Sequence, residues 1–554
     1  MPGWLGCGNR PGPDRPGGRL DNGRQRMRKI LAATIAASVG LLIGAGTVPV
    51  AAAATAPGYT PPAIDWGTCT RPSLQARGAQ CGFLVVPLDY RKPNGTKIKI
   101  AVSRIKHKSS DAAYQGVMLT NPGGPGGSGL GLPVLGEYVP NGAGEFYDWI
   151  GFDPRGVGSS VPSLTCDPNY AGYNRPFYVP VTRQLENTWR AKAKGYAKAC
   201  DAAGGALLDH LKTTDTVADM ESLRKALGVS KINYYGFSYG TYLGQVYATL
   251  HPERVRRFVF DGVVNPERVW YAANLDQDIQ FDKNMDVYFG WIAKNDATYH
   301  LGKTAKAVKQ KYYSTLYSLI RNPAAGKIGP DEWNDVFVSA GYYVFGWQEV
   351  AEAFAAWVNE KDPAPLLNLY AEPGAPGSDN GYAVYLGVQC TDVQWPQNWS
   401  QWRRDNWSVH ARHPFITWNN AWYNAPCINW GAKAGKPVPI NGKKVPPILL
   451  ISETNDAATP YSGAIEVRKR FPRSVLIEGV GGTTHSGSLS GIACTDDTIA
   501  AYLATGELPD RVRGNRSDKR CDPVPQPDPA AATAFSAKIA DDARAEVRDA
   551  IGVR

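Results

Sequence analysis

Short runs of β-branched and aromatic residues alternate with helix-like stretches between residues 80 and 265. The runs CGFLVVPLDY and KIKIAVSRIKH predict a pair of strands, and GVMLTNPGGPGGSG and YDWIGFDPRGVGSS each predict a strand that enters a loop. Residues 213–229 carry Leu, Met and Val at helical spacing with acidic residues early, which is typical of an amphipathic helix. This alternation predicts an α/β fold, with a mostly parallel sheet and helices on both of its faces.

The same alternation continues through KINYYGFS, YGTYLGQVYATLHPERV and RRFVFDGVV, which predict a strand, a helix and a strand. It stops after about Pro266 and resumes near Pro447, where PPILLISETNDAATP and SVLIEGVGGTTHSGS are again strand-to-loop units, followed by a helix-like DDTIAAYLATG. Residues 267–440 have a helical pattern in their first half and an irregular one in their second half. They hold twelve of the sixteen Trp residues, which suits a packed cap inserted into the sheet domain and equally suits plain core packing.

These changes of pattern predict the domain organisation. The expected parts are a signal segment 1–54 (with a possible upstream extension 1–26), an N-terminal core part 55–266, an inserted cap 267–440, a C-terminal core part 441–521 and a tail 522–554. The tail begins as a Pro/Ala-rich linker and ends in FSAKIADDARAEVRDAIGV, which suits one surface helix.

The N-terminal segment has the three regions of an export signal. A basic start at Arg28 and Lys29 precedes an apolar stretch from Ile30 to about Gly44, and small residues follow at 51–54. The apolar stretch is short and rich in Ala and Gly, which favours a cleaved signal over the alternative of a retained membrane anchor. Met27 is a candidate initiator, because residues 1–26 are rich in Gly, Pro and Arg and precede the usual basic region.

Composition and charge narrow the function classes. The chain of 554 residues is 43% hydrophobic and 20% charged, as expected of a globular protein. Its net charge is +10, of which +5 belongs to residues 1–54. No basic run or basic-aromatic alternation follows that segment, so the sequence gives nucleic-acid binding little support.

Cysteine usage agrees with export. Eight cysteines follow Cys7, and an even number in an exported chain indicates disulfides. Their grouping into local pairs predicts the bonds Cys69–Cys81, Cys166–Cys200, Cys390–Cys427 and Cys494–Cys521. A metal site is disfavoured because the chain has no CxxC or HExxH spacing.

One serine stands at the tip of a tight turn, in Gly236-Phe237-Ser238-Tyr239-Gly240. Between a strand and a helix, this G-x-S-x-G pattern indicates a nucleophile elbow, in which crowding admits only small residues two positions either side of the serine. The alternative is a structural serine in a glycine-rich turn. The strand and helix around it favour Ser238 as a catalytic nucleophile.

A serine nucleophile needs a base and a carboxylate, which follow it along the chain in this kind of fold. Of the seven histidines, His107 and His210 precede Ser238, His251 ends the elbow helix, and His300, His410 and His413 fall in the inserted region. Only His485 follows a late strand, in GVGGTTHSGS. We therefore expect His485 as the base and Asp456, in the loop after ILLISE, as the acid, with Glu453 in reserve.

An oxyanion hole requires two backbone N–H groups. One should belong to Tyr239, directly after the nucleophile, and the other to Gly124 in the loop NPGGPGGSG, where Gly123 and Gly124 follow a strand. A phosphate-binding loop is the competing interpretation of these glycines, but no GK[ST] follows them.

Several motifs together resemble one family. NPGGPGGSG, FDPRGVGSS, GFSYGTYLG, DGVVNP, NDAATP and the late His485 are similar to those of the secreted tripeptidyl-aminopeptidase-like branch of the α/β-hydrolases, which is related to proline iminopeptidases. The resemblance covers nearly all of the chain after the signal, and residues 385–521 resemble that branch's C-terminal module. It implies a secreted exopeptidase acting on free N-termini, with no cofactor. One departure is TTHS, where relatives often have Gly before the catalytic His.

An exopeptidase of this kind must bind an ammonium group in a water-poor cap, which calls for a carboxylate near apolar walls. Asp392 is the first candidate, because it follows Cys390 by two residues, and Glu349 and Glu352 on a predicted helix are rivals. The commoner role of any such acid is simply a surface position.

The expected reaction is acyl transfer through Ser238, His485 and Asp456 without a metal. The expected substrates are peptide or protein N-termini, with no stable membrane association once the signal is removed. The alternatives are a secreted carboxylesterase or lipase with the same triad, a cofactor-free haloperoxidase-like hydrolase and a catalytically silent binding module. The presence of all three triad residues argues against the binding module.

Overall fold

A computed structural model describes residues 59–371 and 379–530 of the chain. The predicted signal segment 1–54 and the helix expected at the end of the tail lie outside these residues. None of the helices in the described ranges is long and apolar enough to cross a membrane.

A ten-stranded sheet forms the centre of the core, in the order β1-β2-β3-β5-β4-β6-β7-β8-β9-β10. The strands are β1 Gly67–Thr68, β2 Gln80–Pro87, β3 Lys97–Ile105, β4 Val117–Asn121, β5 Asp148–Phe152, β6 Ile232–Phe237, β7 Val255–Asp261, β8 Leu449–Glu453, β9 Val475–Gly479 and β10 Lys519–Cys521. The first strands pair antiparallel, as far as β3 with β5, and every pair from β5 to β10 is parallel. The predicted mostly parallel α/β sheet is therefore confirmed.

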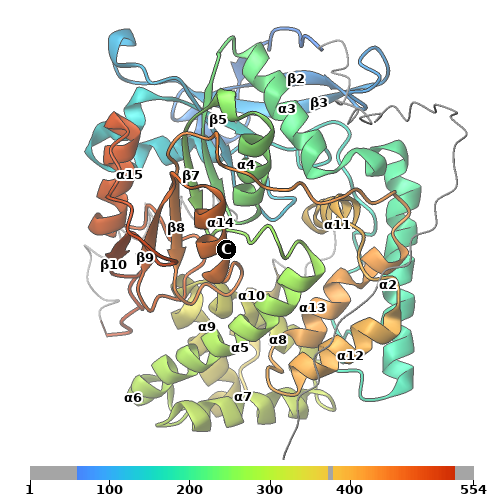
Figure 1. The fold of residues 1–554 in the computed structure, drawn as a ribbon. Helices are drawn as coiled ribbons and strands as arrows, with labels where there is room; N and C mark the ends of the chain where they lie inside the picture. The colour runs from blue at the N-terminus through green and yellow to red at the C-terminus, as the bar shows by residue number, and fades with distance from the viewer. Residues whose placement is uncertain (1–58, 372–378, 531–554) are drawn as a thin grey trace, which may run out of the picture. The chain divides into compact units, whose positions relative to one another are not determined.

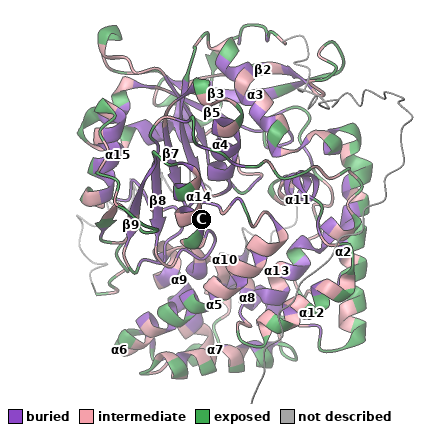
Figure 2. Cartoon of the chain, in the orientation of Figure 1, coloured by how far each residue is buried: buried purple, intermediate pink, exposed green. Residues whose placement is uncertain are grey.

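Helices cover both faces of this sheet. On one face α3 (Thr213–Ala226), α4 (Tyr239–Leu250) and α14 (Ser462–Arg470) bury a cluster that includes Met220, Val246 and Val467. On the other face α15 (Ala493–Thr505) packs Ile499 and Leu503 against strand residues, and Figure 1 shows α15 on the opposite side of the strands from α4. The strands between the layers are almost wholly buried (Figure 2).

The inserted region is a helical cap. Its helices are α5 Tyr271–Lys294, α6 Asp296–Tyr299, α7 Ala305–Leu319, α8 Pro330–Tyr342, α9 Trp347–Ala355, α10 Ala364–Ala371, α11 Asn380–Asp392, α12 Trp399–His410 and α13 Thr417–Asn424. The expectation of an irregular second half was wrong, because α11 to α13 fill much of it. In α11 nine of the thirteen residues are buried, so the helix lacks an exposed polar face that would create a period in the sequence.

Four disulfides and the contacts of the tail link parts of the chain that are distant in the sequence. The structure joins the same four cysteine pairs that the spacing predicts. Helix α2 (Arg183–Gly204) carries Cys200. After β10 the tail runs to the cap, where Val524 joins the hydrophobic cluster of the cap and Pro527 O accepts a hydrogen bond of 2.9 Å from Trp291 Nε1.

Candidate active site

Ser238 occupies a strained turn between β6 and α4. Its backbone has φ 54° and ψ −126°, a region that non-glycine residues rarely adopt outside functional sites. The Ser238 N–H donates to Asp261 O at 2.9 Å. A Cβ atom on Gly236 would lie 2.7 Å from Gly240 O, and one on Gly240 would lie 2.7 Å from Asn121 O. Both flanking glycines are therefore required by close backbone approach, as the sequence pattern indicates.

Asp456 and His485 form a buried pair. His485 Nδ1 lies 2.8 Å and 3.0 Å from the two carboxylate oxygens of Asp456, which is fully buried. The carboxylate also accepts hydrogen bonds from the N–H groups of Ala458 and Thr459 and from Thr459 Oγ1, at 2.8 to 2.9 Å. A proton held on Nδ1 by this carboxylate leaves Nε2 as the basic nitrogen of the imidazole.

The imidazole and the serine flank the same turn after β7. Asp261 O holds the Ser238 N–H, and a Cβ atom on the next residue, Gly262, would lie 2.8 Å from His485 Cε1. His485 Nε2 is buried and has no hydrogen-bond partner among the described residues. The free nitrogen can therefore accept a proton from a group that enters the site.

Glu453, the reserve acid, has different partners. Its two carboxylate oxygens accept hydrogen bonds from Thr484 N (2.5 Å) and Val524 N (2.7 Å), and burial raises the pKa of Glu453 to about 8. Thr484 directly precedes His485, and its Oγ1 accepts a hydrogen bond of 3.3 Å from Val344 N of the cap. Glu453 thus holds the loop that carries His485 and does not contact the imidazole through a hydrogen bond.

The cap also holds this histidine loop. His485 N donates to Tyr342 O at 2.9 Å, and Asn284 Nδ2 donates to Thr483 O at 3.3 Å. The rings of Tyr342 and Tyr343 lie 5.8 Å and 6.2 Å from the imidazole, centroid to centroid. The orientation of the candidate base therefore depends on cap residues as well as on the sheet.

The glycine-rich loop after β4 touches the elbow. A Cβ atom on Gly123 would lie 2.8 Å from Ser238 Cβ and 2.9 Å from Tyr239 N. The Gly123 N–H donates to Asn121 Oδ1 at 3.0 Å, which leaves Gly124, a cavity-lining residue, as the loop's candidate oxyanion donor. Tyr239 is the first residue of α4, so its N–H has no acceptor within the helix. This N–H lies at the positive end of the helix dipole, where it can donate to an oxyanion.

A cavity of about 810 Å³ opens above Ser238, between the core and the cap. This volume suits a ligand of peptide or drug size. Three acids line the cavity, Asp276, Asp335 and Asp379, and so do three basic residues, Arg175, Lys192 and Arg268. The cavity walls otherwise consist mainly of aromatic side chains and amides of the cap.

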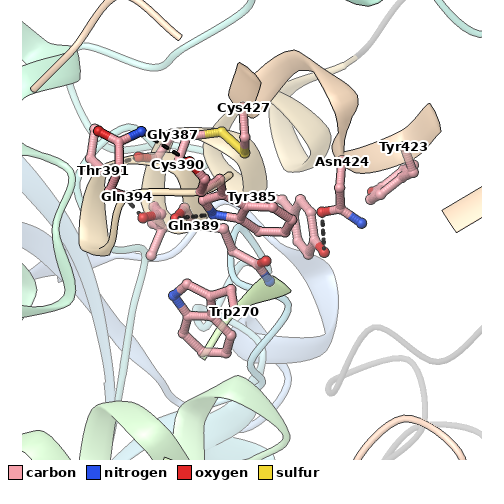
Figure 3. The surroundings of a disulfide bond; sticks show 12 residues. Trp270, Tyr385, Gly387, Gln389, Cys390, Thr391, Gln394, Tyr423, Asn424 and Cys427 are labelled. Carbon is pink, nitrogen blue, oxygen red and sulfur yellow. Dashed lines mark hydrogen bonds between the residues drawn. A yellow bond between two sulfur atoms is a disulfide. The ribbon is translucent and has the colours of Figure 1, made fainter. Parts of the chain in front are cut away.

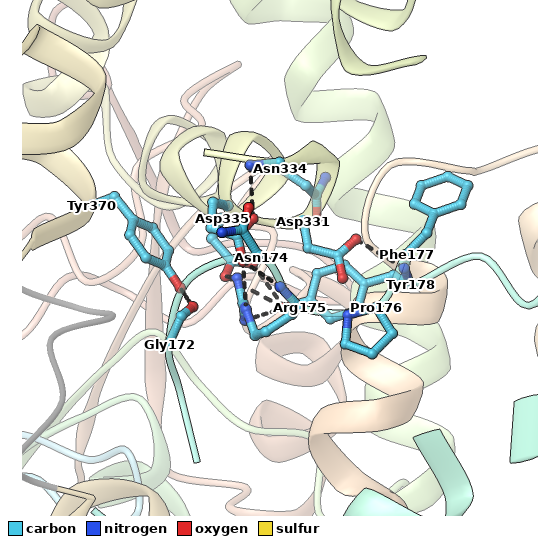
Figure 4. A network of polar contacts seen from close by, with 12 residues as sticks. Gly172, Asn174, Arg175, Pro176, Phe177, Tyr178, Asp331, Asn334, Asp335 and Tyr370 are labelled. Atoms are coloured by element: carbon cyan, nitrogen blue, oxygen red, sulfur yellow. Dashed lines mark hydrogen bonds and ion pairs between the residues drawn. The ribbon is translucent and has the colours of Figure 1, made fainter. Parts of the chain in front are cut away.

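Arg175 is the centre of a polar network in the cavity wall (Figure 4). Its guanidinium forms ion pairs with Asp335 (2.5 Å) and Glu332 (3.0 Å), and it donates to Tyr178 OH at 2.6 Å. Asp331 accepts from Tyr178 N at 2.8 Å, and burial raises the pKa of Asp331 well above its usual value. The charge of Arg175 is therefore already balanced by protein carboxylates.

The structure places neither of the expected amine-binding acids in the cavity lining. Asp392 accepts hydrogen bonds from Thr213 N and Thr213 Oγ1, both at 2.7 Å, and from Trp270 Nε1 at 3.2 Å. Burial raises its pKa to about 6. Glu349 is exposed on α9, as is its rival Glu352.

The disulfide fixes the helix that carries Asp392, but the Asp392 side chain contacts Thr213 rather than the cavity. Cys390 is bonded to Cys427, and Figure 3 shows Tyr385, Gln389 and Asn424 gathered around that bond. Asp392, at the end of the same helix, is directed to the start of α3 instead.

The sequence pattern does not predict two residues of the site. Thr459 supports Asp456 through its hydroxyl, and Asp379 lines the cavity directly before α11. An Asp just ahead of a helix is a usual start signal, so Asp379 could have marked α11 if that stretch had not been interpreted as irregular.

Comparisons with known proteins find similarity over most of the chain. Residues 116–489 match a family model described as alpha/beta hydrolase fold. A tripeptidyl aminopeptidase of Streptomyces lividans is 40% identical over 84% of this chain and 88% of that protein. The serine protease Hip1 of Mycobacterium tuberculosis is 28% identical over 80% of this chain and 89% of its own length. A carboxylesterase B of the same species is 27% identical over 85% of this chain and 96% of its own length.

Proposed function

This chain belongs to the alpha/beta hydrolase fold family and is a serine hydrolase, and we propose that it is an exopeptidase that cleaves peptide bonds near free N-termini. The observation that carries the proposal is the buried His485–Asp456 pair, which contacts the same turn after β7 as the strained Ser238, a residue of the cavity lining. The 40% identity with a tripeptidyl aminopeptidase supports release of tripeptides as the specific activity.

In the proposed mechanism Ser238 Oγ attacks the scissile carbonyl carbon while His485 Nε2 takes its proton. Asp456 holds the imidazole in the required tautomer and stabilises the imidazolium. The N–H groups of Tyr239 and Gly124 donate to the oxyanion of the tetrahedral intermediate. His485 then protonates the leaving amine, and a water activated by the same nitrogen hydrolyses the acyl-enzyme.

Three chromogenic substrates test this function: a tripeptide p-nitroanilide with a free amine, its N-acetyl derivative and a short-chain p-nitrophenyl ester. The proposal expects rapid cleavage of the free-amine peptide and little cleavage of the acetylated one. The variant S238A should lose turnover of every substrate while keeping its melting temperature. Equal cleavage of both peptides would contradict an aminopeptidase.

A carboxylesterase is the second candidate, because one relative over 85% of this chain carries that name. It would use the same serine and base. Cleavage of the ester without cleavage of either peptide, in the same assay, would decide for it.

We also propose that the protein is exported. Residues 27–54 carry the features of a signal, and four disulfides link the described chain. N-terminal sequencing of protein from the culture medium tests this, and recovery of the full-length chain in the cytoplasm alone would contradict it.

A further inference from the structure

Asp379 is a buried carboxylate that the proposed mechanism does not use. Asp379 is only 9% exposed and lines the cavity. Its Oδ2 accepts three hydrogen bonds, from Cys166 N (3.0 Å), Asp167 N (2.8 Å) and Tyr196 OH (2.5 Å). Its Oδ1 is buried and has no hydrogen-bond partner among the described residues. One oxygen is thus fixed by the protein, and the other is left for a donor from outside it.

The other acids of the cavity lining each have a cationic partner. Asp335 pairs with Arg175, and Asp276 pairs with Arg268 at 2.7 Å. Lys192 donates to Tyr170 O at 2.7 Å and forms no ion pair with Asp379 in the described structure. Asp379 is therefore the lining acid whose charge lacks a cationic partner, and a buried carboxylate is stabilised strongly by one.

Tyrosine rings continue this site into the cavity. Tyr196, which donates to Asp379, packs against Tyr170 (4.4 Å) and Tyr382 (4.8 Å), two tyrosines of the cavity lining. Tyr423 lies 4.4 Å from Tyr382 and 5.0 Å from Tyr385, again between ring centroids, and Figure 3 shows Tyr385 with Tyr423. A carboxylate beside aromatic faces is the environment that binds an ammonium ion in preference to an anion or a neutral group.

The position of Asp379 relative to the oxyanion loop limits the ligand's length. A Cβ atom on Gly126 would lie 2.3 Å from Gly381 O, so the loop and the start of α11 are in direct backbone contact. Asp379 and Gly124 are each two residues from that contact. Two residues of chain span at most about 7 Å, so the two positions lie within about 20 Å of each other. An extended peptide of no more than about six residues spans such a distance.

We propose that Asp379 Oδ1 binds the N-terminal ammonium group of the peptide whose carbonyl lies at Ser238. This assignment rests on the proposed exopeptidase function and replaces Asp392 and Glu349 in that role. Asp379 selects substrates with a free amine, and the fixed position of its carboxylate selects short N-terminal segments.

The test removes the charge from the protein and the amine from the substrate. Ala-Ala-Pro-p-nitroanilide is compared with propionyl-Ala-Pro-p-nitroanilide, which lacks only the amine, on the wild type and on D379N. The wild type should prefer the amine substrate by at least about 30-fold in kcat/KM, as for a buried charge pair, and D379N should prefer it by less than about 3-fold. Turnover of the propionyl substrate should be similar in both proteins. Asn keeps an acceptor for the 166–167 loop and turns its amide toward the cavity.

Calorimetry provides the second readout. S238A and the double variant S238A/D379N are titrated with uncleaved Ala-Ala-Pro-amide, and the second protein should bind at least about 30-fold more weakly. D276N is the matched control, since Asp276 also lines the cavity and is paired with Arg268. It should retain the amine preference.

The outcomes separate the two proposals. A wild type that cleaves and binds both ligands equally would overturn the exopeptidase and the ammonium site together. A wild type that prefers the amine and a D379N variant that still does so would overturn only the role of Asp379. Equal loss on both substrates, with a lower melting temperature, would show that Asp379 only holds the 166–167 loop and would reject the assignment as well.

Discussion

At the scale of single residues, Asp456 and Glu453 are three positions apart and have separate roles. Asp456 accepts hydrogen bonds from two backbone N–H groups, from Thr459 Oγ1 and from His485 Nδ1. These donors fix the position of the carboxylate, so that it can orient the imidazole. Glu453 binds the backbone at Thr484 and Val524 instead.

Replacing Asp456 by Asn should therefore remove the orientation of His485 and keep the fold. The expected loss in kcat is about 10⁴-fold, because an Asn at this position can hold the imidazole in the wrong tautomer. Steady-state kinetics on the preferred substrate, with a melting curve for each protein, measure this. The control is E453Q, which should retain most of kcat. An inactive E453Q together with an active D456N would show that Glu453, and not Asp456, orients His485.

The pKa of Glu453 predicts how stability depends on pH. Burial raises this pKa from 4.5 to about 8, so between these values the folded protein holds a proton that the unfolded chain has released. The contribution of this group to stability is therefore complete below about pH 4.5 and is lost as the pH rises through 8. Melting temperatures of wild type and E453Q from pH 5 to 9 should diverge in favour of E453Q as the pH rises. Asp261 and Asp392 titrate in both proteins, so they cannot cause a difference between the two profiles of melting temperature against pH. Parallel profiles would therefore contradict the role of Glu453.

Chain order and residue type predict some site residues better than others. Ser238 and His485 could be selected because the elbow pattern is local and because only one histidine follows a late strand. Asp392 shows the limit of this reasoning, since the direction of a side chain is set by contacts with Thr213 and Trp270, far away in the sequence. Asp379 could not be inferred as a cavity residue for the same reason.

At the scale of elements, the cap helix α5 supports the histidine loop of the core. Asn284 of α5 donates to Thr483 O (3.3 Å) and to Gly341 O (3.2 Å), which joins α5, the end of α8 and the histidine loop. Tyr342, the last residue of α8, accepts the His485 N–H. The cap is therefore expected to influence kcat as well as substrate binding.

The variant N284A tests this coupling. It removes both hydrogen bonds and should lower kcat about 10-fold or more, because a small displacement of the base is costly at the chemical step. The loss of stability should be about 1–3 kcal/mol, since buried carbonyls lose their donor. The control N295A, at the end of the same helix, loses only local bonds such as that to Trp291 O and should keep kcat. A change in KM alone for N284A would contradict the coupling.

The elements themselves were predictable where one of their faces is polar or their residues are β-branched. The expected strands around β2 to β9 and the helix at 213–229 correspond to observed elements because their patterns have clear periods. The sequence does not predict α11, because most of its residues are buried, nor α12 and α13, which are rich in Trp and Asn, residues of modest helix propensity. Tertiary packing, which a single sequence does not display, decides their conformation.

At the scale of the whole described molecule, the tail after β10 links core and cap. Val524 N donates to Glu453 of the core, and the Val524 side chain packs in the hydrophobic cluster of the cap. Three residues later, Pro527 O accepts from Trp291 Nε1 of α5. The tail was expected to be a linker, and its contacts give it a structural role in holding the cap beside the sheet.

A chain that ends at Cys521 should therefore be less stable than one that ends at Ala530. Burial of Val524 contributes about 1.5 kcal/mol and the two hydrogen bonds about 1 kcal/mol each, so the expected loss is roughly 3–4 kcal/mol. Denaturant unfolding of the two proteins measures this difference. Because Glu453 also holds Thr484, the shorter chain should lose kcat along with stability, and V524A should reproduce part of the stability loss with less effect on kcat. Equal unfolding curves for the two chain lengths would show that the cap needs no support from the tail.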